Sequence, residues 1–161
     1  MKLILSLVCL LPVIAFSQDC KLIKEKDPYT REMKSSSGFI ALQGATVTID
    51  ADSKELDFFF SIPEKCFNDA STVFIFFEGA KNKTTYRNAG SMNCDGYFHF
   101  RYKNSLATNT ILQKLATQSV AHFIFMGTDK KEITIALLPD QQKAFMNAVN
   151  CVVNDSKTLI K

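Results

Sequence analysis

The chain has 161 residues, with 19 Lys or Arg and 16 Asp or Glu, and its formal net charge is +3 at pH 7. Such a balanced charge gives no electrostatic support for binding nucleic acid or an anionic membrane surface, and we expect neither partner. Since 47% of the residues are hydrophobic, the chain is long and apolar enough to fold as one domain with a real core.

The first 17 residues, MKLILSLVCLLPVIAFS, are typical of a secretion signal. Lys2 supplies the positive start, and the apolar stretch after it is too short for a comfortable membrane span. Ala15 and Ser17 are the small residues expected before a cleavage site. We therefore predict a signal peptide over residues 1–17 that is cut before Gln18. A buried N-terminal helix is the alternative.

The predicted mature chain, residues 18–161, is expected to be a single globular domain. Gln18 and Asp19 stand where a lipid-modified cysteine needs small residues, so we do not expect Cys20 to carry a lipid. No second apolar stretch of about 18 residues follows in the sequence, so we expect no membrane anchor in the mature chain. The location predicted for it is exported, either periplasmic or secreted.

One expected flexible loop, KSSSG at 34–38, precedes a series of strand-forming segments. Each segment is rich in Phe, Ile, Val or Thr, and turn residues separate most of them. The predicted strands are FIALQ (39–43), TVTID (46–50), ELDFFFSI (55–62), STVFIFFE (71–78), TTYRN (84–88), GYFHFRYK (96–103), VAHFIFMG (120–127) and EITIALL (132–138). Connections of hairpin type favour an antiparallel sheet.

Two segments have helical periodicity. NTILQKLATQ (109–118) places Ile111, Leu112 and Leu115 on one face. PDQQKAFMNAVNCVV (139–153) starts with Pro and Asp, which suit a first helical turn, and its apolar residues fall three or four apart. The predicted fold is therefore α+β, an antiparallel β-sheet of about six to eight strands with two helices packed on one face, the last of them C-terminal.

The 14 Phe residues raise the question of what covers the second face of this sheet. In ELDFFFSI and STVFIFFE, apolar side chains alternate onto both faces of the strand, so both faces should be covered. Two helices cover one face. For the other, three alternatives remain: the sheet curls and packs on itself, a Phe-lined pocket holds a small apolar ligand, or a protein partner docks on exposed Phe.

Four cysteines remain after the predicted cleavage, because Cys9 lies in the signal segment. An even number in an exported chain favours two disulfides over four free thiols, and no CxxC pair supports a zinc site. In an antiparallel meander from ELDFFFSI to GYFHFRYK, Cys66 and Cys94 meet at one edge. We predict this pair and, by elimination, the pair of Cys20 with Cys151.

The sequence has two histidines and no recognisable catalytic motif. His99 shares a strand face with Tyr97 and Arg101, and we expect it to face solvent, whereas His122 is expected to be a core histidine. Neither belongs to an HxH or HExxH pattern, so we predict no catalytic residue, no metal and no cofactor. An enzyme that uses His99 or His122 with nearby carboxylates remains an alternative.

A group of carboxylates clusters around one predicted turn: Asp50, Asp52, Glu55 and Asp57. They lack the spacing of an EF-hand and its distal Glu, so we interpret them as a solvated acidic turn rather than a calcium site. Elsewhere, Asn82 and Asn154 start N-glycosylation sequons, which matter only in a eukaryotic host.

Short motifs stand at both ends of the predicted mature chain: Cys20, Asp27, Tyr29 and Thr30 at the start, and Cys151 in the last helix. They resemble a group of small exported bacterial proteins of unknown function. Members of that group often begin with Cys, continue with Asp-x-aromatic-Thr, and close with a cysteine in a terminal helix. The resemblance implies a Gram-negative envelope or secreted location, and it implies no activity.

These observations together predict an exported, non-enzymatic binding or interaction domain, whose partner is an unknown protein or a small apolar ligand. A carrier that holds a small apolar ligand in a Phe-lined cavity is one alternative. The enzyme that uses His99 or His122 is the other.

Overall fold

The computed structural model describes residues 20–160, so the predicted signal peptide and its cleavage site lie outside the described residues. The strands are β1 (Ile23–Lys26), β2 (Met33–Ser36), β3 (Ile40–Leu42), β4 (Ala45–Ala51), β5 (Glu55–Ser61), β6 (Thr72–Phe77), β7 (Lys83–Arg87), β8 (Tyr97–Lys103), β9 (Val120–Met126) and β10 (Glu132–Ala136). The helices are α1 (Thr110–Thr117), α2 (Pro139–Ser156) and the short 3-10 helix η1 (Lys157–Leu159). An α+β fold of antiparallel strands with a C-terminal helix confirms the predicted class.

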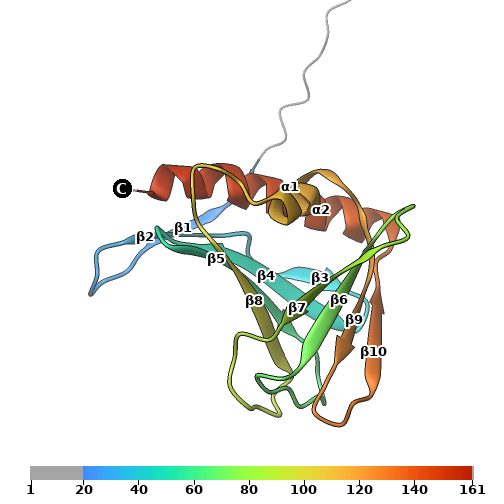
Figure 1. Ribbon diagram of the computed structural model, residues 1–161. Coiled ribbons are helices and arrows are strands. Elements are labelled where there is room, and N and C mark those ends of the chain that lie inside the picture. Colours follow the sequence, from blue (N-terminus) through green and yellow to red (C-terminus); the bar gives the residue numbers. More distant parts are fainter. Residues whose placement is uncertain (1–19, 161) are drawn as a thin grey trace, which may run out of the picture.

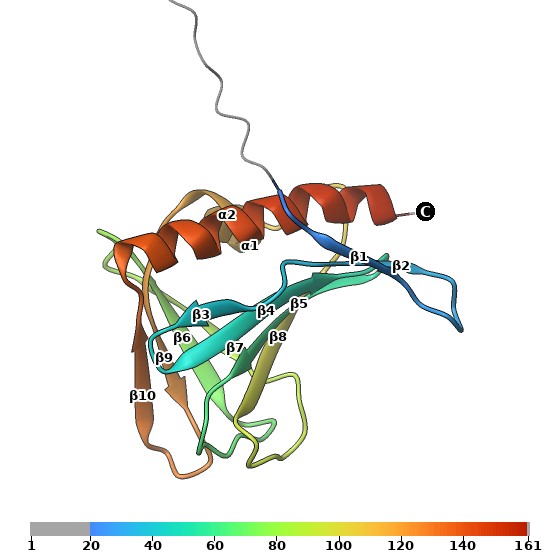
Figure 2. The same cartoon turned by 180° about the vertical axis from the view of Figure 1, so that it is seen from behind.

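The strands form two antiparallel sheets rather than the single sheet that we expected. The first sheet has the order β1-β2-β4-β5-β8, with β3 also paired to β4, and the second has the order β10-β9-β6-β7. Figures 1 and 2 show the two sheets facing each other, with α2 lying along one end of both. Because the sheets cover each other's inner faces, the helices close an end of the core instead of covering one face of one sheet.

The predicted meander is wrong in its strand pairing. β5 pairs directly with β8, from Glu55 opposite Lys103 to Ser61 opposite Tyr97, whereas β6 pairs with β7 and β9 in the second sheet. The chain therefore leaves the first sheet after β5 and returns to it at β8. Alternation of apolar residues predicts that a segment is a strand, but it does not say which strand lies beside it.

The two disulfides nevertheless join the predicted cysteines. Cys66 is bonded to Cys94, with Cα atoms 3.9 Å apart, and Cys20 is bonded to Cys151, with Cα atoms 5.6 Å apart. The first pair forms because Cys66 follows β5 and Cys94 precedes β8, and these strand ends are direct neighbours in the sheet. The second disulfide ties the start of the described chain to α2.

The core between the sheets is built largely of phenylalanine. Phe60 of the first sheet lies 5.1 Å from Phe123 and 5.1 Å from Phe125 of the second, measured between ring centroids. Phe145 of α2 contacts both sheets, at 6.3 Å from Phe58 and 5.5 Å from Phe123. All five rings are fully buried. The inner faces are therefore covered by each other, which corresponds to the alternative in which the β structure packs on itself.

The two helices lie where the sequence predicts them. The Asn109 side chain accepts hydrogen bonds from the backbone N–H groups of Ile111 and Leu112, which fixes the start of α1. Pro139 opens α2, and its buried stripe contains Phe145, Val149, Val152 and Val153, while Met146 is half-buried. None of the helices formed by the described residues has the length and apolar character needed to cross a membrane.

The N-terminal hairpin, formed by β1 and β2, was not predicted. Residues 34–38, expected to be a flexible loop, instead begin in β2, where Ser35 is fully buried and pairs with Ala51 of β4. The Asp27 carboxylate accepts the backbone N–H groups of Thr30 and Tyr29 at the hairpin turn, and these bonds hold the pKa of Asp27 below its ordinary value. Polar residues thus form a strand here because their backbone extends an existing sheet.

Candidate binding groove

Strand register places two rows of side chains on the outer face of the first sheet. Val47 and Ile49 of β4 point into the core. Because side chains alternate along a strand, Thr48 and Asp50 point outward. Thr48 stands opposite Phe59, which stands opposite His99. The second row, two residues further along the strands, contains Ile23, Ser36, Asp50, Asp57 and Arg101. An aromatic row therefore lies beside a row that carries charge.

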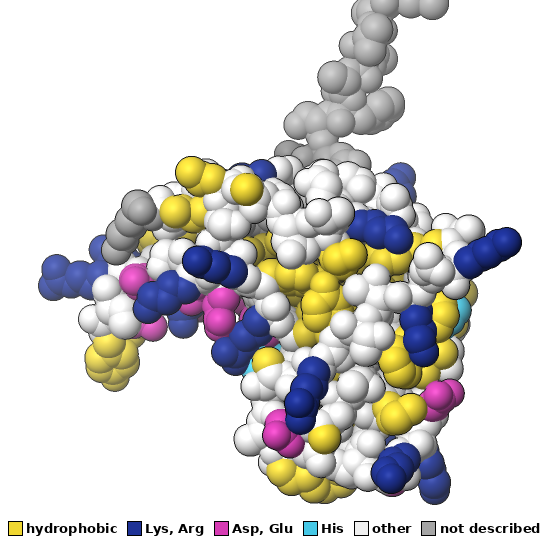
Figure 3. All heavy atoms as spheres, in the orientation of Figure 1, with side chains coloured by type: hydrophobic (Ala, Val, Ile, Leu, Met, Phe, Trp, Pro, Cys, Tyr) yellow, Lys and Arg dark blue, Asp and Glu magenta, His cyan; other side chains and the backbone are white. Residues whose placement is uncertain are grey.

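A groove of about 680 Å³ lies over these rows, and it has the volume of a typical ligand site. We define the groove by the lining residues Ile23, Glu25, Lys34, Phe39, Thr48, Asp50, Asp52, Glu55, Asp57 and Phe59. The N-terminal hairpin contributes one wall and β4 and β5 contribute the floor. Figure 3 shows the acidic side chains gathered in a hollow below this hairpin.

The apolar part of the groove is open to solvent. Phe39, which immediately precedes β3, is 87% exposed, and Ile23 is 51% exposed. Phe59 is half-buried, because its ring contacts Tyr97 at 5.2 Å and His99 at 5.9 Å between centroids. Because Phe39 is so exposed, a ligand that covers its ring removes apolar surface from water, which makes the free energy of binding more favourable.

The charged part of the groove is strongly acidic. Its lining includes five carboxylates and only one amine, that of Lys34. Asp52 accepts the backbone N–H groups of Lys54 and Glu55 at 2.7 and 2.9 Å, so the predicted acidic turn is formed by Asp52. Asp50 and Asp57, by contrast, lie opposite each other on the face of the sheet, which corrects their assignment to a turn.

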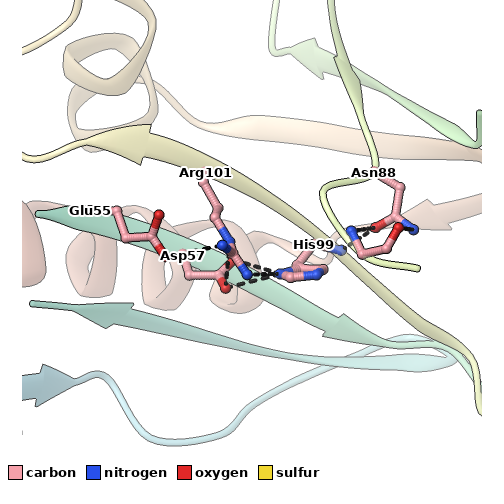
Figure 4. Close-up of polar contacts among 6 residues, drawn as sticks. Glu55, Asp57, Asn88, His99 and Arg101 are labelled. Atoms are coloured by element: carbon pink, nitrogen blue, oxygen red, sulfur yellow. Dashed lines mark hydrogen bonds and ion pairs between the residues drawn. The ribbon is translucent and has the colours of Figure 1, made fainter. Parts of the chain in front are cut away.

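His99 and Arg101 contact two of these carboxylates (Figure 4). His99 Nδ1 lies 2.9 Å from Asp57 Oδ2, and the Arg101 Nε lies 3.3 Å from the same oxygen. Another Arg101 nitrogen lies 3.2 Å from the Glu55 carboxylate. The His99 side chain is only 14% exposed, so the expectation that it faces solvent is wrong. Its partner Asp57 is 42 residues away in sequence, and only the pairing of β5 with β8 brings them together.

The other ring nitrogen of His99 faces the loop at residues 88–90. A Cβ atom on Gly90 would lie only 2.8 Å from His99 Nε2, so the loop backbone covers that edge of the ring. The loop is held there by Asn88, whose side chain accepts the His99 backbone N–H at 3.0 Å. A histidine that acts as a base needs one ring nitrogen open to substrate. This geometry favours a role for His99 in positioning Asp57.

Asp50 is the carboxylate with the least compensation. Among the described residues, its side chain has no hydrogen-bond or ion-pair partner, and it stands directly opposite Asp57 in the register. Like charges in directly opposed positions destabilise a sheet. The outer face of the first sheet therefore retains an unfavourable charge arrangement beside exposed aromatic rings.

His122 lies away from the groove, on β9 of the second sheet. Its ring stacks on Phe76 at 4.5 Å between centroids and is half-buried. The expectation that His122 is a core histidine is therefore wrong. Across residues 20–160, no three His, Cys, Asp or Glu side chains are grouped closely enough to hold a metal ion.

Sequence reasoning singled out the acidic residues but missed the apolar part of the groove. Phe39 carries no signal that separates it from the core phenylalanines, and Ile23 lies in a segment for which no strand was predicted. Comparison of the chain with protein-family models, with curated proteins and with solved structures finds no match in any of the three. The groove must therefore be interpreted from its own chemistry.

Proposed function

We propose that the chain is an exported, non-enzymatic binding domain and that the groove on the first sheet holds its ligand. The observation that carries the proposal is Phe39, which is 87% exposed on the wall of a groove of about 680 Å³. Burying a phenylalanine side chain is worth about 1.5–3 kcal/mol, so a ligand seated against Phe39 gains much of that amount. Asp50, without a partner among the described residues, supplies a polar contact in the same groove.

The proposed location is outside the cytoplasm, in the periplasm or the medium. The support is the signal-like segment at residues 1–17 together with two disulfides, which are compatible with an oxidising compartment. The disulfide between Cys20 and Cys151 also holds β1, one wall of the groove, against α2. Oxidation during export would then complete the binding site.

Neither alternative function receives comparable support. A carrier with a Phe-lined interior needs space between the sheets, whereas Phe60 contacts Phe123 and Phe125 across that space. An enzyme based on His99 needs an open ring nitrogen, whereas Nδ1 faces Asp57 and Nε2 faces Gly90. The exposed aromatic and acidic groove favours binding over both.

The test is photo-crosslinking in the organism that makes the protein. The photoreactive residue p-benzoylphenylalanine replaces Phe39 in one variant and Leu138 in a matched control, because Leu138 is also an exposed apolar residue, at 46%, and lies outside the groove. We expect a discrete adduct from position 39 that position 138 does not give. No adduct at position 39, or the same adducts at both positions, would contradict the proposal.

A further inference from the structure

We infer that the ligand of the groove is an extended segment of a protein partner that carries a Lys or Arg side chain two residues from an apolar one. This inference rests on the proposed function, because it specifies the chemistry of a ligand in the same groove. Charge complementarity is its basis: a groove lined by five carboxylates and one amine repels anions and attracts cations.

Neighbouring cations compensate only part of the acidic charge of the groove. The Lys34 amine lies 3.7 Å from Asp27, so it is shared with a carboxylate at the hairpin turn that does not line the groove. Arg101, on the rim, serves Glu55 and Asp57. Asp50 has no such partner among the described residues, whereas Glu25 stands directly opposite Lys34 in the register of β1 and β2. A cation from outside would be the counter-charge for Asp50, and it would relieve the opposition of Asp50 and Asp57.

The register sets the spacing that the ligand must match. Phe59 and Asp57 are two residues apart on β5, as are Thr48 and Asp50 on β4, so the aromatic and acidic rows are about 7 Å apart. The ligand's cation should therefore lie about 7 Å from its apolar group. In an extended peptide, side chains two residues apart lie on the same face and about 7 Å apart, so a Lys or Arg two residues from an apolar residue matches this spacing.

The width of the sheet favours a peptide over a single amine. From β2 across β4 and β5 to β8 there are three strand spacings, or about 14 Å, which corresponds to about four extended residues. A peptide can place an apolar side chain on Phe39 and Phe59 and a basic side chain on Asp50 at the same time. A small amine would occupy only part of this length.

Binding of defined probes to the oxidised chain 18–161 tests the inference. The probes are fluorescein-labelled octapeptides, capped at both ends, in which every second residue is Ser and the residues between alternate Leu with Lys, Leu with Gln or Leu with Glu. We expect the Lys peptide to bind at least tenfold more tightly than the other two, with an affinity that falls as salt rises from 50 to 500 mM. Fluorescence anisotropy measures all three affinities.

Two matched variants locate the charge that matters. Asp50→Asn should weaken binding of the Lys peptide by roughly threefold to tenfold, because it removes the uncompensated carboxylate. Glu132→Gln makes the same change in net charge on an exposed strand residue of the second sheet, and it should leave the affinity unchanged. Thermal melting confirms that both variants are folded. Equal effects of the two variants would overturn the assignment of the cation to the groove.

Other outcomes separate the inference from the proposed function. If the Gln peptide binds as tightly as the Lys peptide and Phe39→Ala weakens both, the groove is a ligand site but the cationic inference is wrong. If octylamine displaces the Lys peptide and depends on Asp50 and Phe39 to the same degree, the ligand is a small amine rather than a peptide. If no probe responds to Phe39→Ala, the inference fails, and crosslinking at position 39 then decides whether the proposed function fails with it.

Discussion

The phenylalanines between the two sheets and the phenylalanines of the groove show the same residue type in two different roles. Phe60 is fully buried and contacts rings of the facing sheet, while Phe39 is 87% exposed and lies beside carboxylates. The interior rings contribute stability because other rings already cover them. The protein itself does not cover the groove rings, so a ligand can gain free energy by covering them. Substitution of an interior ring should therefore lower stability, whereas substitution of a groove ring should weaken ligand binding.

A single strand contributes to both regions. On β5, Phe58 and Phe60 point inward into the core. The alternate residues Asp57 and Phe59 point outward into the groove. The outer face of the second sheet offers a further contrast, because Lys83 covers Phe74 at 3.6 Å from its ring centroid. An exposed ring beside unpaired carboxylates is therefore a feature of the groove and not of every outer surface.

The largest effect is expected from removing the disulfide that ties the groove wall to the helix that closes the interior. Cys20→Ala with Cys151→Ala removes a crosslink spanning 131 residues, which the chain-entropy account values at about 5 kcal/mol. Cys66→Ala with Cys94→Ala removes one spanning 28 residues, valued at about 3.6 kcal/mol. Urea unfolding measures both losses. Only the first pair should also speed amide exchange in β1, and protection of β1 unchanged in that variant would contradict its tethering role.

The interior should be the region most sensitive to a single substitution. Phe145→Ala leaves a cavity between Phe58 and Phe123, so we expect the free energy of unfolding to fall by about 3–5 kcal/mol. Lys143→Ala changes an exposed position of the same helix and should cost little. Gln142 is a poor control, because its side chain donates a hydrogen bond to Glu78 at 2.8 Å. If the Phe145 and Lys143 variants melt together near wild type, α2 does not close the core as described.

Gly96 links the two regions, because it immediately precedes β8, which supplies Phe98 to the core and His99 as the partner of Asp57 in the groove. Gly96 and Gly79 both have positive φ angles, +78° and +68°, so alanine at either position costs about 1–2 kcal/mol of backbone strain. At Gly96 a Cβ atom would also lie 1.9 Å from the Ile62 carbonyl oxygen, whereas nothing lies within 4 Å at Gly79. Gly96→Ala should therefore lower the melting temperature clearly more than Gly79→Ala. Equal losses would mean that the close approach of β5 and β8 is not rigid.

Local features of the fold were predictable from the sequence. Asn109 and Pro139 mark helix starts through their own chemistry, and the stripe that contains Phe145 repeats every three or four residues. Most strands were predictable for the same reason, since alternation is visible within a segment. The disulfide pairing was correct although the strand order behind it was wrong, because both arrangements bring the end of β5 to the start of β8.

The candidate site was not predictable, because it depends on contacts between distant segments. His99 was assigned to the correct strand face, but its pairing with Asp57 depends on which strand lies beside β8. The N-terminal hairpin has few apolar residues, and its backbone forms a strand because β4 offers an edge. Phe39 belongs to a residue type that is usually buried, so its exposure follows only from the three-dimensional structure.

The smallest effect on stability is expected in the groove itself. Phe39→Ala removes a side chain that is 87% exposed, so the free energy of unfolding should change by no more than about 0.5 kcal/mol. The same substitution should weaken binding of the Lys and Leu octapeptide, because the ring is a wall of the groove. Urea unfolding and fluorescence anisotropy on one preparation measure the two quantities. Phe60→Ala supplies the opposite case, with a large loss of stability expected from an interior ring. If Phe39→Ala destabilised the chain as strongly as Phe60→Ala does, Phe39 would belong to the core, and the distinction between stabilising and binding phenylalanines would fail.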